Sequence, residues 1–245
     1  MASPTASVTQ WPNVAAVDSF FSSISTEDIT RYQEYWRTLT PEDYLENFER
    51  WLFAFCSVHT SWSSNVRGFE AIKKWVSWYQ DSAELKQRLV ASGVGLHENR
   101  TKFIGKFCDD YWANPQVFYK TQGEDWVQYR DRLVKRILGL GFAKVSFALE
   151  LSYPCAAEVV CLDTHMFQFY GLDQTKHARH YHALERHWVT HCLDRNVPST
   201  VARAIYWDRK QKRTDSRYWT HVLERRSTYA QETTAVHTEG IVNIV

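Results

Sequence analysis

The sequence predicts an all-α protein, and two observations support that fold class. Apolar side chains recur at helical spacing, as in Phe48, Trp51, Leu52 and Phe55, which share one face of a helix. No segment alternates apolar and polar residues over several positions, as a half-buried strand would. The short apolar run 159–162 is the best strand candidate, but it lies between helical segments. We therefore expect helices throughout.

Local signals mark where individual helices start and stop. Residues 40–43 (Thr-Pro-Glu-Asp) are typical of a helix start, with Thr40 as the N-cap, proline next and acidic residues in the first turn. An apolar stripe over residues 126–137 predicts one helix, and a stripe over residues 142–149 predicts another. Residues 196–200 (Asn-Val-Pro-Ser-Thr) predict the end of one helix and the start of the next.

Composition places the chain among ordinary globular proteins. Of its 245 residues, 44% are hydrophobic, and 29 basic side chains against 28 acidic ones give a net charge of +1. These values exclude intrinsic disorder. No stretch approaches the ~18 consecutive apolar residues that span a bilayer. The five cysteines are widely spread without a C-x-x-C motif, which is typical of reduced thiols. We expect a cytoplasmic monomer that does not contact membranes.

The most informative segment is a glycine-rich turn between two predicted helices. Gly139-Leu-Gly141 allows a tight reversal, because glycine reaches positive φ at low cost. The N–H groups that start the next helix, around Phe142 and Ala143, stay uncovered, and Lys144 follows about one turn in. Such a helix start attracts phosphate oxygens, so the segment predicts a sequence-independent contact with a nucleic-acid backbone. The alternative is an ordinary tight turn with glycine as the C-cap.

Three further segments extend the pattern of this hairpin. Residues 161–166 read Cys-Leu-Asp-Thr-His-Met, and Asp163 follows Lys144 by 19 residues. With the Gly-x-Gly turn, this segment resembles the helix-hairpin-helix DNA glycosylase superfamily, most closely its 8-oxoguanine DNA glycosylase branch. Residues 53–72 and 93–104 also resemble helical segments of that superfamily, although the second has threonine where the family has alanine.

The resemblance implies two helical lobes with DNA bound in the cleft between them. We assign residues 46–149 to a central lobe that ends in the hairpin, and residues 16–45 with 150–235 to a terminal lobe. Residues 1–15 are expected to form a disordered tail, and residues 236–245 a second tail. Glycosylases of this kind flip the target nucleotide out of the duplex into a pocket. The implied partner is therefore double-stranded DNA with a flipped nucleotide.

Two residues are the catalytic candidates that the resemblance implies. Asp163 matches the carboxylate that stabilises oxocarbenium character on the sugar when an N-glycosidic bond breaks. Its position before Thr164 equally suits a helix N-cap. Lys144 matches the lysine that forms a Schiff base in bifunctional members. The family pattern places that lysine where this chain has Ala143, so Lys144 is a nucleophile in a longer turn, a phosphate contact or a surface lysine.

Further residues are candidate contacts to DNA. His59 lies where relatives place a wedge residue that enters the emptied base stack, and the alternative is a helix-end histidine bonded to the backbone. The segment 207–219 interleaves basic and aromatic side chains, which suits a nucleic-acid groove. The other expected DNA contacts, besides the hairpin, are Arg100, His165, Arg209, Lys210 and Arg213. The expected base-pocket residues are Trp62, Phe167 and Phe169, for which core packing is the alternative.

The sequence predicts no iron–sulfur cluster, no metal ion and no other cofactor. The four-cysteine loop of endonuclease III-like members is missing, since only Cys192 follows Asp163. Five histidines gather in residues 177–191, with His187 and His191 spaced i, i+4 as metal ligands often are. No acidic residue completes an H-E-x-x-H motif. We interpret these histidines as solvated or bonded to the backbone, with structural zinc as the alternative.

Three functions are consistent with these motifs. The first is a DNA glycosylase, with or without lyase activity, that acts on a damaged or modified base. The second transfers an amino acid or amine onto pyrophosphorylated 5-hydroxymethyluracil in DNA, as in glycosylase-like proteins of bacteriophages that hypermodify thymine. The third is a non-catalytic DNA-binding module. We expect the glycosylase, with the transferase as the alternative because the lysine is off register and the C-terminal third is unmatched.

Overall fold

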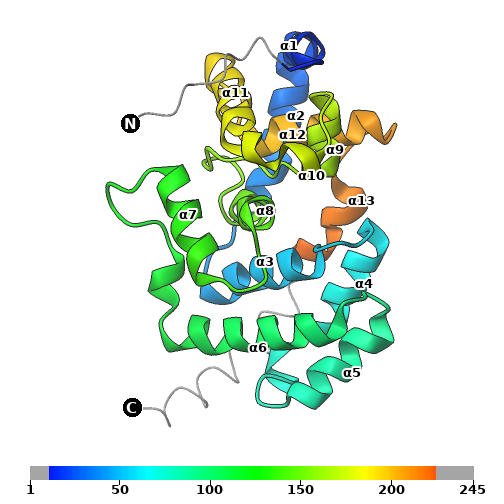
Figure 1. Ribbon diagram of the computed structural model, residues 1–245, viewed down its shortest axis with the longest axis vertical. Coiled ribbons are helices and arrows are strands. Elements are labelled where there is room, and N and C mark those ends of the chain that lie inside the picture. The colour runs from blue at the N-terminus through cyan, green and yellow to red at the C-terminus, as the bar shows by residue number, and fades with distance from the viewer. Residues whose placement is uncertain (1–10, 225–245) are drawn as a thin grey trace.

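Helices make up the regular secondary structure of residues 11–224, the part of the chain that the computed structural model describes (Figure 1). The all-α class is thus confirmed. The helices are α1 (Val14–Ser23), α2 (Thr26–Thr38), α3 (Tyr44–Cys56), α4 (Trp62–Ile72), α5 (Ser82–Ser92), α6 (His97–Ala113), α7 (Trp126–Arg136), α8 (Phe142–Ser152), α9 (Thr164–Phe169), α10 (Gln174–His177), α11 (Tyr181–Asp194), α12 (Ser199–Lys210) and α13 (Arg217–Thr220). Among these helices, none is long and apolar enough to cross a membrane.

Several helices, among them α2, α3, α4, α5 and α7, begin at a capping side chain. Asp43 caps α3 by accepting a hydrogen bond from the N–H of Glu46 at 2.8 Å. The start predicted at residues 40–43 is therefore a few residues too early, because Asp43 and not Thr40 provides the cap. The break predicted at residues 196–200 is confirmed, since it separates α11 from α12.

The helices form two groups that meet at α8 (Figure 1). In the lower group of the view, α3 packs against α4, α6 and α8, with α5 and α7 nearby. In the upper group, α12 packs against α2, α11 and α8, beside α1, α9 and α10. The predicted lobe boundaries 45/46 and 149/150 fall in the first turn of α3 and in the last turn of α8, and the division into two lobes stays a prediction. α13 reaches the lower group and contacts α4.

The central place of α3 in the lower group follows from its composition. Its aromatic residues Phe48, Trp51, Phe53 and Phe55 are at most 2% exposed. A helix that is apolar on several sides must be covered on several sides, and α4, α6 and α8 supply that cover. α3 therefore ties the start of α4 and the hairpin helix α8 to one core.

The predicted N-terminal tail is too long. Trp11 is only 6% exposed and packs edge-on against the Tyr170 ring with centroids 5.5 Å apart. α1 begins soon after, so residues 11–15 belong to the fold because an aromatic side chain anchors them. The rest of both predicted tails and the end of the predicted terminal lobe lie in residues 1–10 and 225–245, outside the described residues.

Candidate active site

The turn between α7 and α8 depends on glycine at its first position. Gly139 has φ +86°, in the left-handed region that other residues rarely adopt. A Cβ atom there would also collide with the Phe103 ring of α6. At Gly141, by contrast, φ is −90° and a Cβ atom would meet nothing within 4 Å. The backbone of the turn therefore requires Gly139, whereas Gly141 leaves the start of α8 sterically open.

The N-terminus of α8 is accessible and has no side-chain cap. Phe142 is 37% exposed, and the guanidinium of Arg130 lies 4.9 Å from the centre of its ring. Ala143 is partly buried. Lys144 is also partly buried, with Nζ 5.7 Å from the centre of the Phe147 ring. The uncapped N–H groups and the lysine give this end of α8 a positive potential that suits a phosphate oxygen.

A buried carboxylate of α8 holds the segment that leads to Asp163. Glu150 is 0% exposed and accepts a hydrogen bond from the N–H of Cys161 at 3.2 Å. It also forms an ion pair with Arg203 of α12, with 2.6 Å between Oε2 and Nη2. The partner arginine stabilises the buried charge, which would otherwise be strongly unfavourable. The ion pair and the hydrogen bond place the residues before Asp163 against α8 and α12.

A second buried pair holds the same segment from another side. Glu185 of α11 accepts a hydrogen bond from the N–H of Val160 at 3.3 Å and pairs with Arg130 of α7 at 2.7 Å. Burial raises the pKa of both Glu150 and Glu185, and each arginine partner opposes that shift. Contacts from α7, α8, α11 and α12 therefore fix the position of the backbone that precedes Asp163.

Asp163 is the N-cap of α9, so the capping interpretation is confirmed. Its Oδ1 accepts hydrogen bonds from the N–H groups of His165 and Met166, each at 3.0 Å. Among the described residues, Oδ2 has no hydrogen-bond partner. The cap thus fixes the orientation of the carboxylate while one oxygen stays available for a ligand.

Asp163 and Lys144 line one cavity of about 270 Å³. The end of α3 and the start of α4 form one side, α9 and the end of α12 form another, and α8 lies between them. The lining residues are Ser57, Thr60, Ser61, Trp62, Asn65, Lys144, Asp163, His165, Trp207 and Gln211. Small-molecule sites typically measure about 300–1,000 Å³, so this cavity is of a size for a small group such as a single base.

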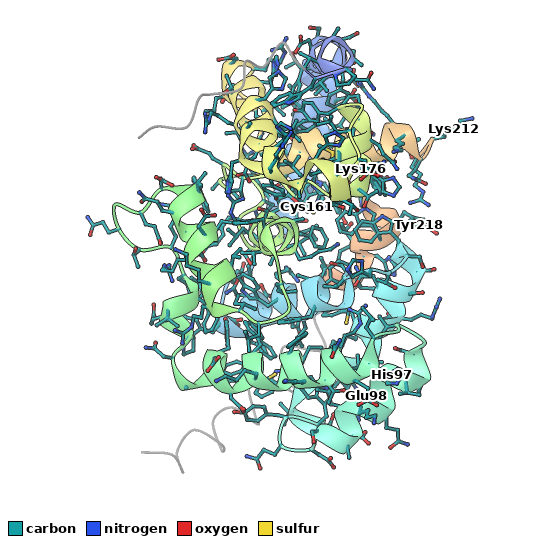
Figure 2. All side chains as sticks on the ribbon, viewed as in Figure 1. His97, Glu98, Cys161, Lys176, Lys212 and Tyr218 are labelled. Carbon is teal, nitrogen blue, oxygen red and sulfur yellow. The ribbon has the colours of Figure 1, made fainter. Side chains whose placement is uncertain are left out.

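The thiol of Cys161, two residues before Asp163, is not a competing nucleophile. Cys161 lies near the centre of the molecule (Figure 2) and is 2% exposed. Burial raises the pKa of its thiol to about 12, so the thiol stays protonated at neutral pH. The ionisable side chains of the cavity wall are Lys144, Asp163 and His165.

Two cavity residues that no motif marks carry polar groups without a partner. Asn65 of α4 is 0% exposed, and neither its Oδ1 nor its Nδ2 is hydrogen-bonded within the described chain. The indole N–H of Trp207 in α12 is likewise buried and unpaired there. Each such group costs about 1–3 kcal/mol, and a ligand in the cavity would supply the missing bonds. The available sequence signal is that Asn65 interrupts the apolar stripe of Trp62, Val66 and Phe69.

The three predicted base-pocket aromatics have different surroundings. Trp62 lines the cavity and stacks on Trp219 of α13, with ring centroids 4.4 Å apart. Phe167 is 0% exposed and is not part of the cavity wall, so its prediction is wrong because the side chain belongs to the core. Phe169 also lies outside the wall, because its ring stacks on Tyr206 at 4.2 Å.

One predicted DNA contact is a structural residue. Arg100 is 3% exposed, and its guanidinium donates hydrogen bonds to the carbonyls of Phe55 and Val58. The prediction is wrong because Arg100 satisfies the free carbonyls at the end of α3. His59, in contrast, is exposed with φ +47° and directly precedes the cavity residue Thr60. Its contact with DNA stays a prediction.

The predicted basic contacts Arg209, Lys210 and Arg213 of the C-terminal segment, and His165 of α9, have two kinds of surroundings. Lys210 Nζ lies 3.3 Å from Nδ1 of His165, which lines the cavity. Arg209 forms an ion pair with an aspartate of α2, and Arg213 lies over the Tyr218 ring at 3.4 Å. Figure 2 shows Tyr218 at the side of the molecule where α13 and α4 meet. Lys210 and His165 are therefore the basic residues of this set that lie beside the cavity.

The histidine-rich segment falls into two environments. His177 bonds the backbone carbonyl of Asp173 at 2.9 Å, as the interpretation of solvated or backbone-bonded histidines requires. That interpretation is wrong for His187 and His191, whose side chains are 8% and 20% exposed and face Asp18 of α1. The carboxylate comes from the other end of the sequence, so spacing within the segment gave no sign of it.

Two solved structures share the fold of the chain. The 8-oxoguanine DNA glycosylase of Thermotoga maritima superposes with a TM-score of 0.65 at 15% identity, covering 82% of this chain and 99% of that one. The 8-oxoguanine DNA glycosylase of Methanocaldococcus jannaschii gives 0.62 at 14% identity, covering 82% and 96%. No protein-family model and no curated protein matches the sequence. The chain therefore has the fold of these two glycosylases, as its resemblance to the helix-hairpin-helix superfamily predicts.

Proposed function

We propose that the chain is a DNA glycosylase that flips a damaged or modified base into the cavity and breaks its N-glycosidic bond. The observation that carries the proposal is that Lys144, beside the hairpin, and Asp163, at the cap of α9, line the same cavity. The fold shared with two 8-oxoguanine DNA glycosylases adds support. Because one fold can host several chemistries, the residues of the cavity decide the reaction.

The start of α8 is the proposed contact with the DNA backbone. Its free N–H groups follow Gly141, where no side chain blocks the approach of a phosphate. Lys210 and His165 add basic groups at the cavity. Contacts of this kind position the duplex without reading its sequence and weaken steeply as salt is added.

Asp163 is the proposed catalytic carboxylate. Its capped Oδ1 holds the group in place, and Oδ2 stabilises positive charge on the sugar or orients the attacking water as the base departs. Asp163 performs both roles at once, because the cap uses one oxygen and the chemistry uses the other.

Lys144 is the proposed nucleophile of an associated lyase step. Its amine attacks the sugar carbon that loses the base, and the resulting imine allows strand cleavage. The one-residue offset from the family pattern would turn a helical side chain by about 100°. Lys144 nevertheless lines the cavity together with Asp163, which supports this role.

Asn65 and Trp207 are the proposed base-reading residues. The Asn65 amide presents a donor beside an acceptor, and this pair is complementary to a base edge that also carries one donor and one acceptor. The Trp207 indole adds one donor. Trp62 offers a ring for stacking.

Nucleoside mass spectrometry on a panel of duplexes, each with one modified base, tests the proposal. The panel starts with 8-oxoguanine and includes 5-substituted pyrimidines. We expect release of one free base and an abasic site, both lost in Asp163→Asn. A base that gains mass while its sugar bond stays intact would replace the glycosylase with the transferase. Salt-sensitive binding without either change would indicate a DNA-binding module.

Borohydride trapping tests the role of Lys144. We expect the wild-type protein to be trapped on DNA and Lys144→Ala to escape trapping. Lys106→Ala is the control, because it removes an exposed lysine of α6 that does not line the cavity, and this variant should still be trapped. Base release by the wild-type protein without trapping would assign Lys144 to phosphate binding instead.

A further inference from the structure

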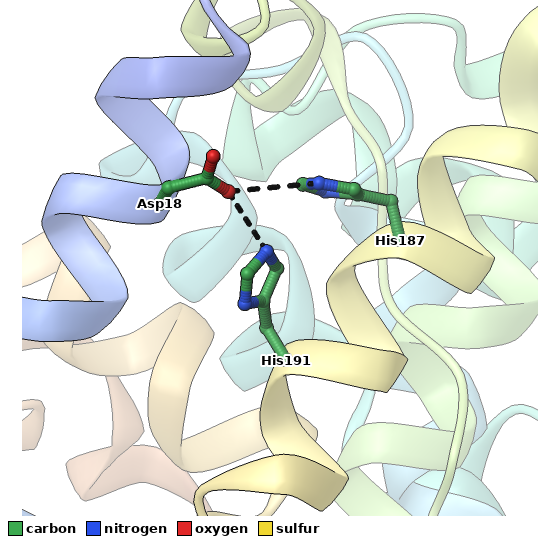
Figure 3. Close-up of side chains that lie close together, drawn as sticks. All are labelled: Asp18, His187 and His191. Atoms are coloured by element: carbon green, nitrogen blue, oxygen red, sulfur yellow. Dashed lines mark ion pairs between the residues drawn. The ribbon is translucent and has the colours of Figure 1, made fainter. Parts of the chain in front are cut away.

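Three potential metal ligands meet between α1 and α11, apart from the proposed active site. Figure 3 shows Asp18 of α1 facing His187 and His191, which lie one turn apart on α11. One ligand atom from each residue lies within 4.8 Å of the other two. None of the three lines the cavity of Asp163. The proposed glycosylase reaction therefore does not involve this cluster.

The spacing of the ligand atoms suits a small tetrahedral ion. Asp18 Oδ1 is 2.9 Å from His191 Nε2 and 3.7 Å from His187 Nε2. Zinc bonds of about 2.0–2.2 Å place tetrahedral ligand atoms about 3.4 Å apart. At 3.7 Å, His187 Nε2 is too far from Asp18 for a hydrogen bond. An ion between them would bind both groups with only small side-chain movements.

The surroundings of His187 orient its ring for metal binding. Its Nδ1 lies 3.0 Å from the hydroxyl of Tyr170, which is 0% exposed. A metal-ligating histidine typically donates its second ring N–H to such an oxygen, which directs the other nitrogen to the ion.

The ring of His191 is held by stacking on one side and by the exposed Arg195 side chain on the other. It stacks on Phe21 of α1, with centroids 4.8 Å apart. The Arg195 guanidinium lies 3.4 Å from its Nδ1, but this side chain is exposed and can turn away when Nδ1 carries a hydrogen. Nε2 of His191 already points to Asp18.

We propose that Asp18, His187 and His191 bind one divalent transition-metal ion, with zinc as the best match. Two imidazoles select such an ion over calcium or magnesium, which prefer oxygen ligands. With one carboxylate added, the donor set is that of a site with three protein ligands, which leaves a fourth position for water or an external ligand. The ion would fasten α1 to α11. The proposal revises the expectation of a metal-free protein and is independent of the proposed function.

Titration calorimetry and thermal unfolding with zinc chloride, after removal of metal by a chelator, test the site. We expect one zinc ion per chain and a melting temperature that rises with zinc. Asp18→Asn and His191→Gln should each abolish the rise. Both side chains are partly exposed, so the folds of these variants should survive. Tyr170→Phe should weaken binding about ten- to a hundredfold, as loss of a partner to a ligating histidine usually does.

A matched control separates the cluster from general histidine binding. His177 and His180 form another histidine pair, with ring centroids 6.1 Å apart. A variant with both changed to glutamine should keep the zinc-dependent rise. Cobalt should give the intense visible absorption of a four-coordinate ion in the wild-type protein but not in Asp18→Asn. The site would be refuted by zinc stabilisation that is equal in the wild-type protein and Asp18→Asn, or by the absence of one-to-one binding.

Discussion

Buried polar groups differ sharply between the wall of the cavity and the layer beneath it. In that layer, Glu150 and Glu185 each face an arginine and each accept a backbone N–H. At the wall, the Asn65 amide and the Trp207 indole have no partner among the described residues. The difference separates two purposes. Paired groups hold the chain in place, and unpaired groups beside an open space are complementary to a ligand.

The largest expected effect is at Asp163, a wall residue with one carboxylate oxygen paired and the other free of a partner among the described residues. Asp163→Asn should lower base release about a hundred- to ten-thousandfold, because the charge is lost. The melting temperature should hardly change, since asparagine caps a helix as well as aspartate does. Single-turnover kinetics and thermal unfolding measure the two effects.

Asp173→Asn is the control for this variant. Asp173 caps α10 in the same manner but is not part of the cavity wall. It should therefore leave both base release and stability unchanged. If both variants lose base release equally, the loss at Asp163 reflects its cap and not its position in the cavity.

The second largest effect is expected on stability, from breaking the buried ion pair of Glu150 and Arg203 beneath the cavity wall. Glu150→Ala should lower the free energy of unfolding by about 3–5 kcal/mol, because it leaves Arg203 buried without its partner. Replacing both residues at once, with Glu150→Leu and Arg203→Met, should recover much of that loss. Denaturant titration measures both variants. A single variant as stable as the double variant would mean that the pair is solvated.

Because the Asn65 amide in the cavity wall has no partner, its replacement should have the opposite effect on the free energy of unfolding. Asn65→Leu should leave the free energy of unfolding unchanged or raise it by about 1 kcal/mol, because no native hydrogen bond is lost. Selectivity between bases should fall about tenfold or more, since each lost contact to a base edge is worth ~1–3 kcal/mol. Competition between duplexes with different bases measures this change.

Asn47 supplies the matched control on α3. It is also buried, but its Nδ2 donates a hydrogen bond to the Tyr111 hydroxyl at 3.2 Å. Asn47→Leu should therefore destabilise the fold by about 1 kcal/mol or more and leave base selectivity intact. Equal destabilisation by both substitutions would show that Asn65 has a native partner, and the contrast between wall and layer would fail.

The smallest effect lies at a paired carboxylate near the surface. The hydrogen bond from Arg132 lowers the pKa of Glu124 from 4.5 to about 2. A lowered pKa means that the folded state favours the ionised form, so this stabilisation is complete above pH 4.5 and disappears as the pH falls toward 2. After solvent screening it amounts to about 1 kcal/mol. Glu124→Gln should flatten that part of the stability curve, which acid titration of unfolding measures.

Patterns that depend on neighbours in the sequence were predictable, and contacts between distant segments were not. Helical spacing predicts the all-α class, and the glycines of the turn predict the hairpin. Arg100 looks like a DNA contact until the fold brings the carbonyls of Phe55 and Val58 to it. Phe167 looks like a stacking residue until the core closes over it.

The candidate metal site shows the same limit. His187 and His191 form a visible pair, but Asp18 reaches them only because α1 packs beside α11. The unpaired state of Asn65 is equally invisible in the sequence, because it depends on which side chains surround α4 in the fold.

The Phe103 ring beside Gly139 ties the hairpin to a helix 36 residues earlier in the chain. A replacement at position 139 must both adopt an unfavourable backbone angle and displace that ring. The hairpin is therefore not an independent module. If it were grafted onto another protein without α6, its two helices would lack the surface that sets the angle between them. Evolutionary change at position 103 and at position 139 should therefore be coupled.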